Sequence, residues 1–390
     1  MHHAADILLQ LFIVYAAALV GGELAQRLKM PGVVGEIVAG ALIGPSALGW
    51  VRPDEPLQLL AEIGVVLLLF AVGLETRLGE LRRVGAAALA VGVLGVVFPF
   101  AGATLWAHGS GFGWDPSMFV AAAFVATSVG ITARVLQELG VLQRTESRVI
   151  LGAAVIDDIL AMLLLGVVVS LQQGGRLDPL HLGVLLLEAV GFLAVIGFVG
   201  TRAARLRSDW LERPINPLSP LTIVLALCLG LAWLSTRFGL AAIIGAFLAG
   251  VIASETRQRE QLEHQMQPLL ALLTPFFFAV TGMQLKLAVF ADPRALWMLA
   301  AATAIAIASK VLGGFLGALS LRPRSALIVG VGMVPRGEVG VVIASLGLAA
   351  GVFSDRIYAV IVAMSLLTAV VTPPALAWLL RRAPADVPTT

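Results

Sequence analysis

Long apolar stretches recur from one end of the chain to the other, with only short polar connections between them. Each stretch is about 17 to 25 residues long, the length that a helix needs to cross the hydrocarbon core of a bilayer. Because lipid offers backbone polar groups no partner, every such stretch is predicted to be helical. Thirteen spans are predicted, at residues 7–26, 33–50, 58–76, 85–107, 117–139, 148–171, 182–203, 220–236, 239–254, 266–285, 294–319, 325–350 and 357–380.

The composition agrees with an all-α polytopic membrane protein and excludes several other classes. Of the 390 residues, 59% are hydrophobic and only 13% are charged, and soluble domains do not reach this balance. The single cysteine excludes a disulfide within the chain and a cysteine metal cluster. The five histidines are scattered at span ends or in loops. No cofactor is expected, and the short connections leave no room for a soluble regulatory domain.

The distribution of Lys and Arg predicts how the chain is oriented in the membrane. With the N-terminus outside, the cytoplasmic connections hold 17 of the 26 basic residues and the external connections hold 6. Cytoplasmic loops of membrane proteins carry such an excess. An odd number of spans then places the C-terminus in the cytoplasm. The same bias accounts for the basic residues without any role for nucleic acid.

Two short segments recur at nearly one spacing, which indicates an internal duplication. IVAGALIG at 37–44 resembles FLAGVIAS at 247–254 at an offset of 210 residues, and LLFAVGLETRL at 68–78 resembles FFFAVTGMQLKL at 276–287 at an offset of 208. The offset maps the first six spans onto the last six and leaves the seventh as a linker. Because the first span enters from outside and the eighth from inside, the second set is predicted to be inverted, as in many transporters.

Polar and helix-breaking residues fall at corresponding places in the two halves. They are Thr127, Ser128 and Gly130 in the fifth span, and Pro335 and Gly337 in the twelfth. Proline lacks a backbone N–H and glycine is conformationally permissive, so the twelfth span is predicted to break. Matching interruptions in two halves are typical of a transporter's binding site. Arg336 and Glu338 would balance the partial charges of the half-helix ends, although an ordinary proline kink is the alternative.

Two adjacent carboxylates lie inside the sixth span, in GAAVIDDILA at 152–161. An ionised aspartate at that depth costs about 2.5–3.5 kcal/mol, so Asp157 and Asp158 require an explanation. Successive side chains on a helix diverge by about 100°, so one carboxylate is expected to face an ion cavity and the other a neighbouring helix. Lys310, in the middle of the eleventh span, is the natural partner of the carboxylate that faces the neighbouring helix. The structural alternative is a buried aspartate–lysine tether with a solvated spare carboxylate.

The charges of this predicted centre favour competition between a cation and a proton. Its three acids (Asp157, Asp158 and Glu338) and two bases (Lys310 and Arg336) sum to −1 when all are ionised. Either one monovalent cation or one proton would neutralise the centre. Oxygen ligands from Asp158, with Asp157, Thr127 and Ser128 as further candidates, suit Na⁺ or Li⁺ rather than soft metals. Arg134 and Glu138, four residues apart near the cytoplasmic end of the fifth span, are predicted to pair at the cytoplasmic funnel.

Several segments together resemble one family of transporters. They are ATSVGITARVLQELGVL at 126–142, LGAAVIDDIL at 151–160, SKVLGGFLGAL at 309–319, GVGMVPRGEVG at 330–340, PGVVGEIVAGALIGP at 31–45 and LLLFAVGLETRL at 67–78. The chain resembles bacterial sodium/proton antiporters of the monovalent cation:proton antiporter-2 family, NapA type, over essentially its whole length. The resemblance implies an NhaA-like antiporter fold of thirteen helices with two inverted six-helix repeats and crossing discontinuous helices. It implies a secondary active transporter, not an enzyme.

The resemblance also implies a domain plan and roles for single residues. A dimer domain would comprise residues 1–80 and 219–290, a core ion-translocation domain 81–175 and 291–390, and a linker helix 176–218. The essential ion-binding and proton-exchanging aspartate falls on Asp158, its lysine-paired neighbour on Asp157, and the lysine on Lys310. Such proteins are homodimers of the bacterial inner membrane that move by an elevator mechanism. The paired aspartates with the lysine imply electrogenic export of cytoplasmic Na⁺, or Li⁺, in exchange for external H⁺.

Four alternative functions differ in the chemistry that they require. A K⁺/H⁺ antiporter of the Kef type would share the architecture, because ion selectivity is not readable from these residues. A sodium-coupled organic-anion symporter would need a larger cavity. An intramembrane aspartyl protease needs two aspartates on separate helices facing one peptide bond, whereas these two are adjacent. A channel would need an open pore, which the dense charge pairing disfavours.

Overall fold

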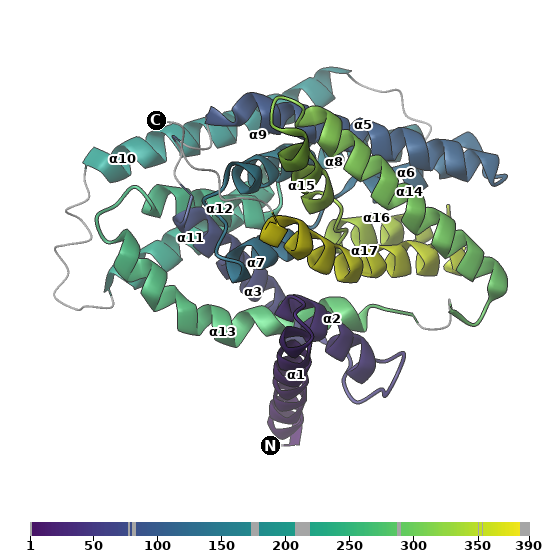
Figure 1. Cartoon of the computed structure of the whole chain (residues 1–390), viewed down its shortest axis with the longest axis horizontal. Coiled ribbons are helices and arrows are strands. Elements are labelled where there is room, and N and C mark those ends of the chain that lie inside the picture. The colour runs from purple at the N-terminus through teal and green to yellow at the C-terminus, as the bar shows by residue number, and fades with distance from the viewer. Residues whose placement is uncertain are drawn as a thin grey trace.

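The computed structural model describes residues 2–382 apart from 77–78, 80–82, 173–178, 207–218, 287–289, 350 and 353. Helices make up most of this part of the chain (Figure 1). In chain order they are α1 (His2–Arg27), α2 (Gly32–Ile43), α3 (Glu55–Leu74), α5 (Gly85–Gly109), α6 (Trp114–Val125), α7 (Val129–Glu138), α8 (Thr145–Gln172), α9 (Pro179–Val195), the π-helical turn η1 (Ile196–Gly200), α10 (Thr201–Leu206), α11 (Ser219–Arg237), α12 (Ala242–Ala253), α13 (Arg259–Met283), α14 (Pro293–Gly317), α15 (Pro323–Gly332), α16 (Glu338–Ala349) and α17 (Asp355–Arg382).

These helices follow the apolar spans predicted from the sequence. Within the described ranges, nine helices are long and apolar enough to cross a membrane, and three shorter apolar helices accompany them. The fifth and twelfth predicted spans are each divided into two helices, α6–α7 and α15–α16. The chain is therefore an all-helical polytopic membrane protein.

The predicted end of the second span is wrong for a local reason, and α13 begins at Arg259 rather than at residue 266. The second span was expected to run over residues 33–50, but α2 ends at Ile43. The next residue, Gly44, has an extended backbone with φ −69° and ψ 175°. Pro45 follows it, and a residue that precedes proline is disfavoured in the α region. The rest of this segment forms a turn in which Gly49 has a φ of 66°.

The helices pack in two groups. In the first, α3 packs against α12 and α13, and α2 packs against α1 and α13. In the second, α5 packs against α6, α8 and α14, while α17 packs against α14, α15 and α16. A separate apolar core joins α5, α6, α14, α16 and α17. The broken helices α6–α7 and α15–α16 belong to the second group, and α7 also contacts α3 and α2 of the first.

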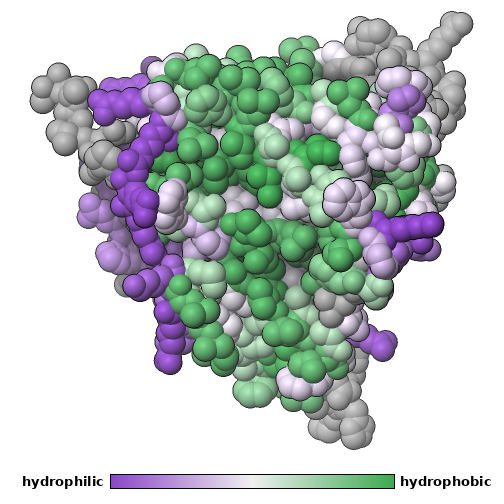
Figure 2. All heavy atoms as spheres, turned by 45° about the vertical axis from the view of Figure 1, so that its right-hand side comes forward, coloured by the Kyte–Doolittle hydropathy of each residue, from purple (hydrophilic) through white to green (hydrophobic). Residues whose placement is uncertain are grey.

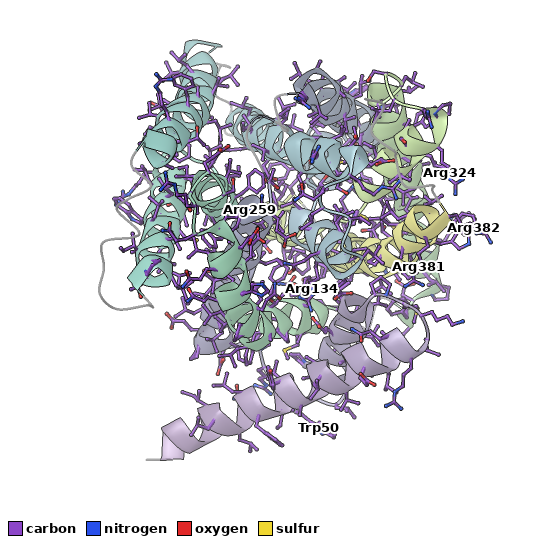
Figure 3. The ribbon with its side chains drawn as sticks, turned by 60° about the vertical axis from the view of Figure 1, so that its left-hand side comes forward. Trp50, Arg134, Arg259, Arg324, Arg381 and Arg382 are labelled. Carbon is purple, nitrogen blue, oxygen red and sulfur yellow. The ribbon has the colours of Figure 1, made fainter. Side chains whose placement is uncertain are left out.

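The surface has the character of a protein that faces lipid. Figure 2 shows a face covered mostly by apolar side chains, with hydrophilic ones gathered toward its margins. Helix α1 lies at one edge of the molecule and leads away from it to the N-terminus (Figure 1). Arg324, Arg381 and Arg382 lie near one another at another edge (Figure 3). These three arginines belong to the segments that the charge distribution assigns to the cytoplasm.

Candidate functional site

The breaks in the two interrupted helices lie against each other. The backbone N–H of Ser128, between α6 and α7, donates a hydrogen bond to the carbonyl of Pro335, between α15 and α16, at 2.8 Å. Thr127 Oγ1 donates to the carbonyl of Met333 at 3.4 Å. A Cβ added at Gly337 would lie only 2.5 Å from Ser128 Oγ. Glycine at position 337 therefore allows the two broken segments to approach so closely.

A buried cation lies at the carboxyl end of the first half-helix in each pair. Lys310 Nζ, from α14, donates to the carbonyl of Val125, the last residue of α6, at 2.9 Å. Arg336 Nη1 donates to the carbonyl of Val334, just after α15, at 2.8 Å. Both side chains are fully buried. The carboxyl end of a helix carries partial negative charge, so each break is stabilised by a cation that the protein itself supplies.

Asp157 is a buried member of this network. Its Oδ1 accepts a hydrogen bond from Lys310 Nζ at 2.7 Å, and its Oδ2 accepts one from the backbone N–H of Thr127 at 3.1 Å. Lys310 Nζ also donates to the carbonyl of Gly95 in α5 at 2.7 Å, so all three of its N–H groups have acceptors. Two buried charges stabilise each other only when their remaining hydrogen-bonding groups are satisfied, and here they are.

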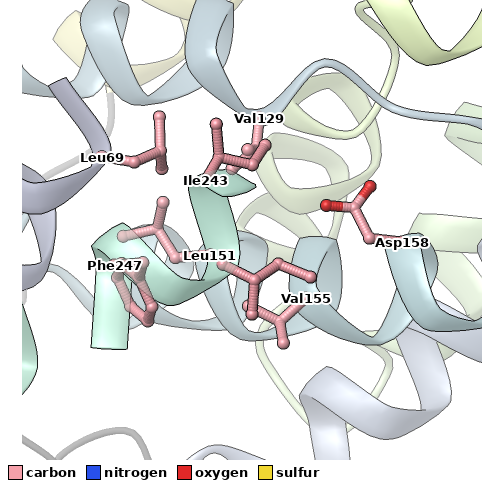
Figure 4. A pocket seen from close by; sticks show the side chains of 8 residues that line it. Leu69, Val129, Leu151, Val155, Asp158, Ile243 and Phe247 are labelled. Atoms are coloured by element: carbon pink, nitrogen blue, oxygen red, sulfur yellow. The ribbon is translucent and has the colours of Figure 1, made fainter. Parts of the chain in front are cut away.

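Asp158 points in another direction, as the divergence of adjacent helical side chains requires. It is partly exposed and lines a small chamber of about 10 Å³ together with apolar residues. These residues, several of which Figure 4 shows around the chamber, are Leu69 of α3, Val129 of α7, Leu151 and Val155 of α8, and Ile243, Ile244 and Phe247 of α12. A chamber of this size is at the lower limit for holding one water molecule. Of the two carboxylates, only Asp158 lines this chamber.

The remaining predicted residues surround this centre. Gly130, in the first turn of α7, lies beside Phe277 and Val65. Arg134 and Glu138, at the far end of α7, form an ion pair at 2.9 Å. Glu338 begins α16, but its side chain lies outside the described residues.

The Arg134–Glu138 pair reaches α2 as well. Glu138 Oε2 accepts a hydrogen bond from the backbone N–H of Gly32 at 2.9 Å. Arg134 Nη2 lies 4.0 Å from Glu36 Oε1. The pair therefore bridges the two groups of helices.

The sequence did not reveal several partners in the network. The carbonyl of Ala306 accepts from Arg336 at 3.2 Å, and the hydroxyl of Thr368 accepts from the backbone N–H of Arg336 at 3.1 Å. The Thr132 hydroxyl donates to the carbonyl of Gly332 at 2.7 Å. Backbone carbonyls carry no sequence signal, and the two threonines lie in apolar runs where a hydroxyl most often bonds within its own helix.

The polar atoms offered at the helix breaks are oxygen atoms. Among the residues that the structure describes, no three His, Cys, Asp or Glu side chains are grouped to hold a metal ion. At the helix breaks the oxygen donors are the Thr127 hydroxyl and the carbonyls of Met333 and Pro335. Such oxygen donors suit hard cations.

Comparison with known proteins places the chain among ion exchangers. Residues 14–382 match the family described as sodium/hydrogen exchanger, transmembrane. The chain is 36% identical to the high-affinity Na⁺/H⁺ antiporter NhaS3 of Synechocystis sp., over 95% of this chain and 89% of the relative. It is 34% identical to the Na⁺/H⁺-K⁺ antiporter GerN of Bacillus cereus, over 95% of each.

The fold also matches a solved structure. The sodium proton antiporter MjNhaP1 of Methanocaldococcus jannaschii superposes with a TM-score of 0.71 over 98% of this chain and 99% of that one, at 15% identity. At this identity the match carries information about the fold alone.

Proposed function

The chain belongs to the sodium/hydrogen exchanger family, and we propose that it is a secondary transporter that exchanges Na⁺ or Li⁺ for H⁺ at Asp158. The observation that carries this assignment is the difference between two adjacent carboxylates. Asp157 is fully buried and bonded to Lys310, whereas Asp158 opens onto the chamber. Of the two carboxylates, only Asp158 borders a space that an ion could enter.

Na⁺ and H⁺ would compete for the Asp158 carboxylate. A bound cation would complete its coordination with the hydroxyls of Thr127 and Ser128 or with the carbonyls freed by the helix breaks, and Asp157 would be a further candidate ligand. Protonation of Asp158 removes the charge that attracts the cation, so a proton arriving from one side releases Na⁺ to that side. Arg336 and Lys310 supply positive charge that keeps the unliganded centre from accumulating excess negative charge.

The lysine favours an electrogenic cycle. The ammonium of Lys310 is held by Asp157 and two backbone carbonyls. If the Asp157 carboxylate turned from Lys310 toward a bound cation, the ammonium would lose the negative charge that stabilises it and would release its proton. That proton would be additional to the one exchanged at Asp158. We propose that more than one proton enters for each Na⁺ that leaves. The membrane potential would then contribute about 2.3 kcal/mol per net charge per 100 mV.

K⁺/H⁺ exchange is the second candidate. A relative with 34% identity bears the name Na⁺/H⁺-K⁺ antiporter, so K⁺ transport occurs at this level of similarity. The chamber of about 10 Å³ beside Asp158 disfavours an organic anion as a co-transported substrate, because such a substrate needs a larger cavity.

Contacts between glycines and neighbouring backbones support the inverted repeat and a thirteen-span NhaA-like fold. A Cβ added at Gly35 would meet the carbonyl oxygen of Gly21, and one added at Gly245 would meet that of Leu231, while Gly73 and Gly282 stand in the same relation to Phe247 and Ile37. Gly35 and Gly21 lie 210 positions before Gly245 and Leu231. In the other pair of contacts, Gly73 lies 209 positions before Gly282, and Ile37 lies 210 positions before Phe247. The spacing matches the 210-residue offset found in the sequence, so we take these contacts as two interactions, each made once in either half of the chain.

The two groups of helices suggest how transport proceeds. We propose that α1–α3 and α11–α13 form a dimer domain, that α5–α8 and α14–α17 form a core domain which moves against it as an elevator, and that the segment around α9 and α10 links them. Helix α1 carries several exposed apolar side chains, including Leu8, Phe12 and Leu19, which suits a homodimer contact in the membrane. The proposed location is the bacterial inner membrane, with the N-terminus outside and the C-terminus in the cytoplasm.

The test is transport by purified protein in liposomes. Solid-supported membrane currents after jumps of Na⁺, Li⁺ or K⁺ between pH 5 and 9 would be compared for the parent and for Asp158→Asn. We expect Na⁺ and Li⁺ currents that weaken competitively at low pH and vanish in the variant. Asp54→Asn is the matched control, because Asp54 caps α3 by accepting from Leu57 N–H and asparagine caps equally well. Currents with K⁺ alone would favour the second candidate, and unchanged exchange by Asp158→Asn would refute the site.

A further inference from the structure

A groove of about 370 Å³ lies between α1 and α2. Every residue that lines it is apolar or a glycine. Gly21 and Gly35 line it where the helices are close together, since a Cβ added to Gly21 would lie only 2.4 Å from the carbonyl oxygen of Gly35. Ala25 and Ala39 continue the lining with small, buried side chains. The small residues of the two helices thus leave an apolar hollow above their contact.

The rim of the groove is apolar and exposed. Leu24 and Leu42 are each 54% exposed, and Leu28 is 70% exposed. Along α1 the lining extends from Ala17 to Leu28, which is about 16 Å at ~1.5 Å per residue. The hydrocarbon core of a bilayer is about 30 Å thick, so the groove covers the depth of one leaflet. An acyl chain that lies along the helices fits a groove of this length and polarity.

Three basic residues lie at the end of the groove that Leu28 marks. Lys29 follows it in the chain, and the Lys29 carbonyl accepts a hydrogen bond from Arg381 Nη1 at 3.3 Å. The guanidinium of Arg382 lies 4.2 Å from the centre of the Trp378 ring, and Figure 3 shows Arg381 and Arg382 near each other. We call Lys29, Arg381 and Arg382 the basic corner. The charge distribution assigns all three to the cytoplasmic side.

The charges of the basic corner are not neutralised within the described part of the chain. The neighbouring Arg27 is bonded to Glu23 at 3.0 Å. Among the residues that the structure describes, no acidic side chain pairs with any member of the basic corner. Trp378, which is 53% exposed, is the kind of side chain that lies at the level of lipid head groups. An anion at this level would supply the missing negative charge.

Lys29 occupies a backbone position that suits glycine. Its φ is 60°, and the N–H of Met30 donates to the carbonyl of Ala25 at 2.9 Å, which closes the end of α1. A residue that follows a helix in this left-handed conformation is most often glycine, because glycine has no Cβ to strain. The backbone therefore does not account for a lysine here, whereas a ligand for its ammonium would.

The groove and the proposed homodimer contact lie on different sides of α1. The contact set is Leu8, Phe12 and Leu19, and the groove set on the same helix is Val20, Leu24 and Leu28. At about 100° per residue, the centres of the two sets are roughly 140° apart around the helix. A second subunit on the first set therefore leaves the groove open to lipid.

We propose that the groove and the basic corner together bind one anionic phospholipid of the cytoplasmic leaflet, with an acyl chain between α1 and α2 and the phosphate at Lys29, Arg381 and Arg382. Basic pockets between membrane helices on the cytoplasmic side bind such head groups. Lys29 belongs to the first group of helices and the two arginines to the second, so the lipid joins the groups. The site is separate from Asp158, and a chain that binds the lipid but exchanges no cation would refute only the proposed function.

Native mass spectrometry of the purified full chain tests the ligand. Phosphatidylglycerol and phosphatidylcholine with identical acyl chains would be added in turn, because only the first carries a net negative charge. We expect one phosphatidylglycerol to be retained by each subunit and phosphatidylcholine to be lost at lower collision energy. Equal retention of the two lipids overturns the proposal. Displacement of phosphatidylglycerol by glycerol 3-phosphate, which has no acyl chain, overturns it as well.

Single substitutions test the basic corner. Lys29→Gly removes the ammonium and relieves the backbone, so it should lower the affinity for phosphatidylglycerol about five-fold without lowering Tm, and Lys29→Arg should keep the parent affinity. Arg382→Gln should also lower it about five-fold. Arg237→Gln is the matched control, because Arg237 lies 5.3 Å from the centre of the Trp233 ring at the predicted external end. Equal losses in Arg382→Gln and Arg237→Gln, or none in Lys29→Gly, refute the site.

The groove is tested separately from the head group. Phosphatidylglycerol with a photoreactive diazirine in its acyl chain would be cross-linked to the protein in liposomes, and the labelled peptides identified. We expect labelling of residues 17–48 that is lost in Val38→Trp, because Val38 lines the groove. Leu105→Trp is the control, since Leu105 is 70% exposed on α5 and does not line the groove. Even labelling of all exposed helices, or labelling unchanged by Val38→Trp, overturns the proposal. A shift from dimer to monomer in Val38→Trp with lipid retention unchanged would assign the groove to a second subunit and overturn it too.

Discussion

Replacing Lys310 with methionine tests whether the buried ion pair stabilises the site. Methionine keeps much of the side-chain length but removes the ammonium that donates to Asp157, Gly95 and Val125. Asp157 is fully buried, so its carboxylate would lose its charge partner in an apolar setting. Removing one member of a buried pair costs about 3–5 kcal/mol, because the remaining charge is left uncompensated.

The expected change in melting temperature follows from the chain length. At roughly 2.1 cal/mol/K per residue, a chain of 390 residues has an unfolding entropy of about 0.8 kcal/mol/K. A loss of 3–5 kcal/mol then lowers Tm by roughly 4–6 °C. Thermal unfolding in detergent, followed by size-exclusion chromatography with tryptophan fluorescence, measures this change. Lys286→Met is the control, because Lys286 is exposed and should shift Tm by less than about 1 °C.

A double variant separates the ion pair from simple loss of packing. Asp157→Asn removes the charge that Lys310→Met leaves uncompensated, so the two changes together should be less damaging than their sum by about 1–3 kcal/mol. The asparagine oxygen can still accept from the N–H of Thr127, as Asp157 Oδ2 does at 3.1 Å. Additive effects, or a fall for Lys310→Met no larger than that for Lys286→Met, would refute the reasoning.

Two further predictions concern the helix break and the contact between α7 and α2. Gly337→Ala places a Cβ 2.5 Å from Ser128 Oγ, so the two helix breaks must move apart. We expect transport in liposomes to be about 100-fold slower. Gly109→Ala is the control and should leave transport unchanged, because Gly109 has open space around it. Glu138→Gln weakens the bond to the α2 N-terminus and should speed labelling of Leu151→Cys from the cytoplasmic side. Glu146→Gln is the control, because Glu146 of α8 accepts a hydrogen bond from Ser325 of α15 within one group of helices. Equal labelling in both variants would contradict the idea that the bond from Glu138 to α2 restricts access to Leu151.

The sequence was most informative where physics leaves few alternatives. Apolar length predicted where the helices lie, because lipid permits little else. The side-by-side aspartates predicted that one would face a partner and the other a cavity, and the structure places Asp157 against Lys310 and Asp158 at the chamber. The wall that α12 contributes to the chamber was not predicted, because Ile243, Ile244 and Phe247 resemble any other apolar residues in this chain.

Proline alone did not predict the helix breaks reliably. Pro99, Pro268, Pro275, Pro373 and Pro374 all lie inside continuous helices. The segment at Pro335 differs because its freed backbone groups have partners. Its carbonyl accepts from Ser128 N–H at 2.8 Å, and the next N–H is bonded to Thr368. A break persists when tertiary contacts satisfy the groups that the helix no longer bonds, and such contacts are not readable from local sequence.

The break between α6 and α7 forms without any proline and leads to the same conclusion. Between α6 and α7 the chain reads Ala126-Thr127-Ser128, residues that could continue a helix. Lys310 instead holds the carbonyl that ends α6, and Asp157 accepts from the N–H of Thr127. These charges thus hold the helix open next to the chamber that Asp158 lines. Neutralising either one should therefore alter cation affinity at Asp158 even though neither need touch the ion, because the carbonyls and hydroxyls offered to it depend on the break.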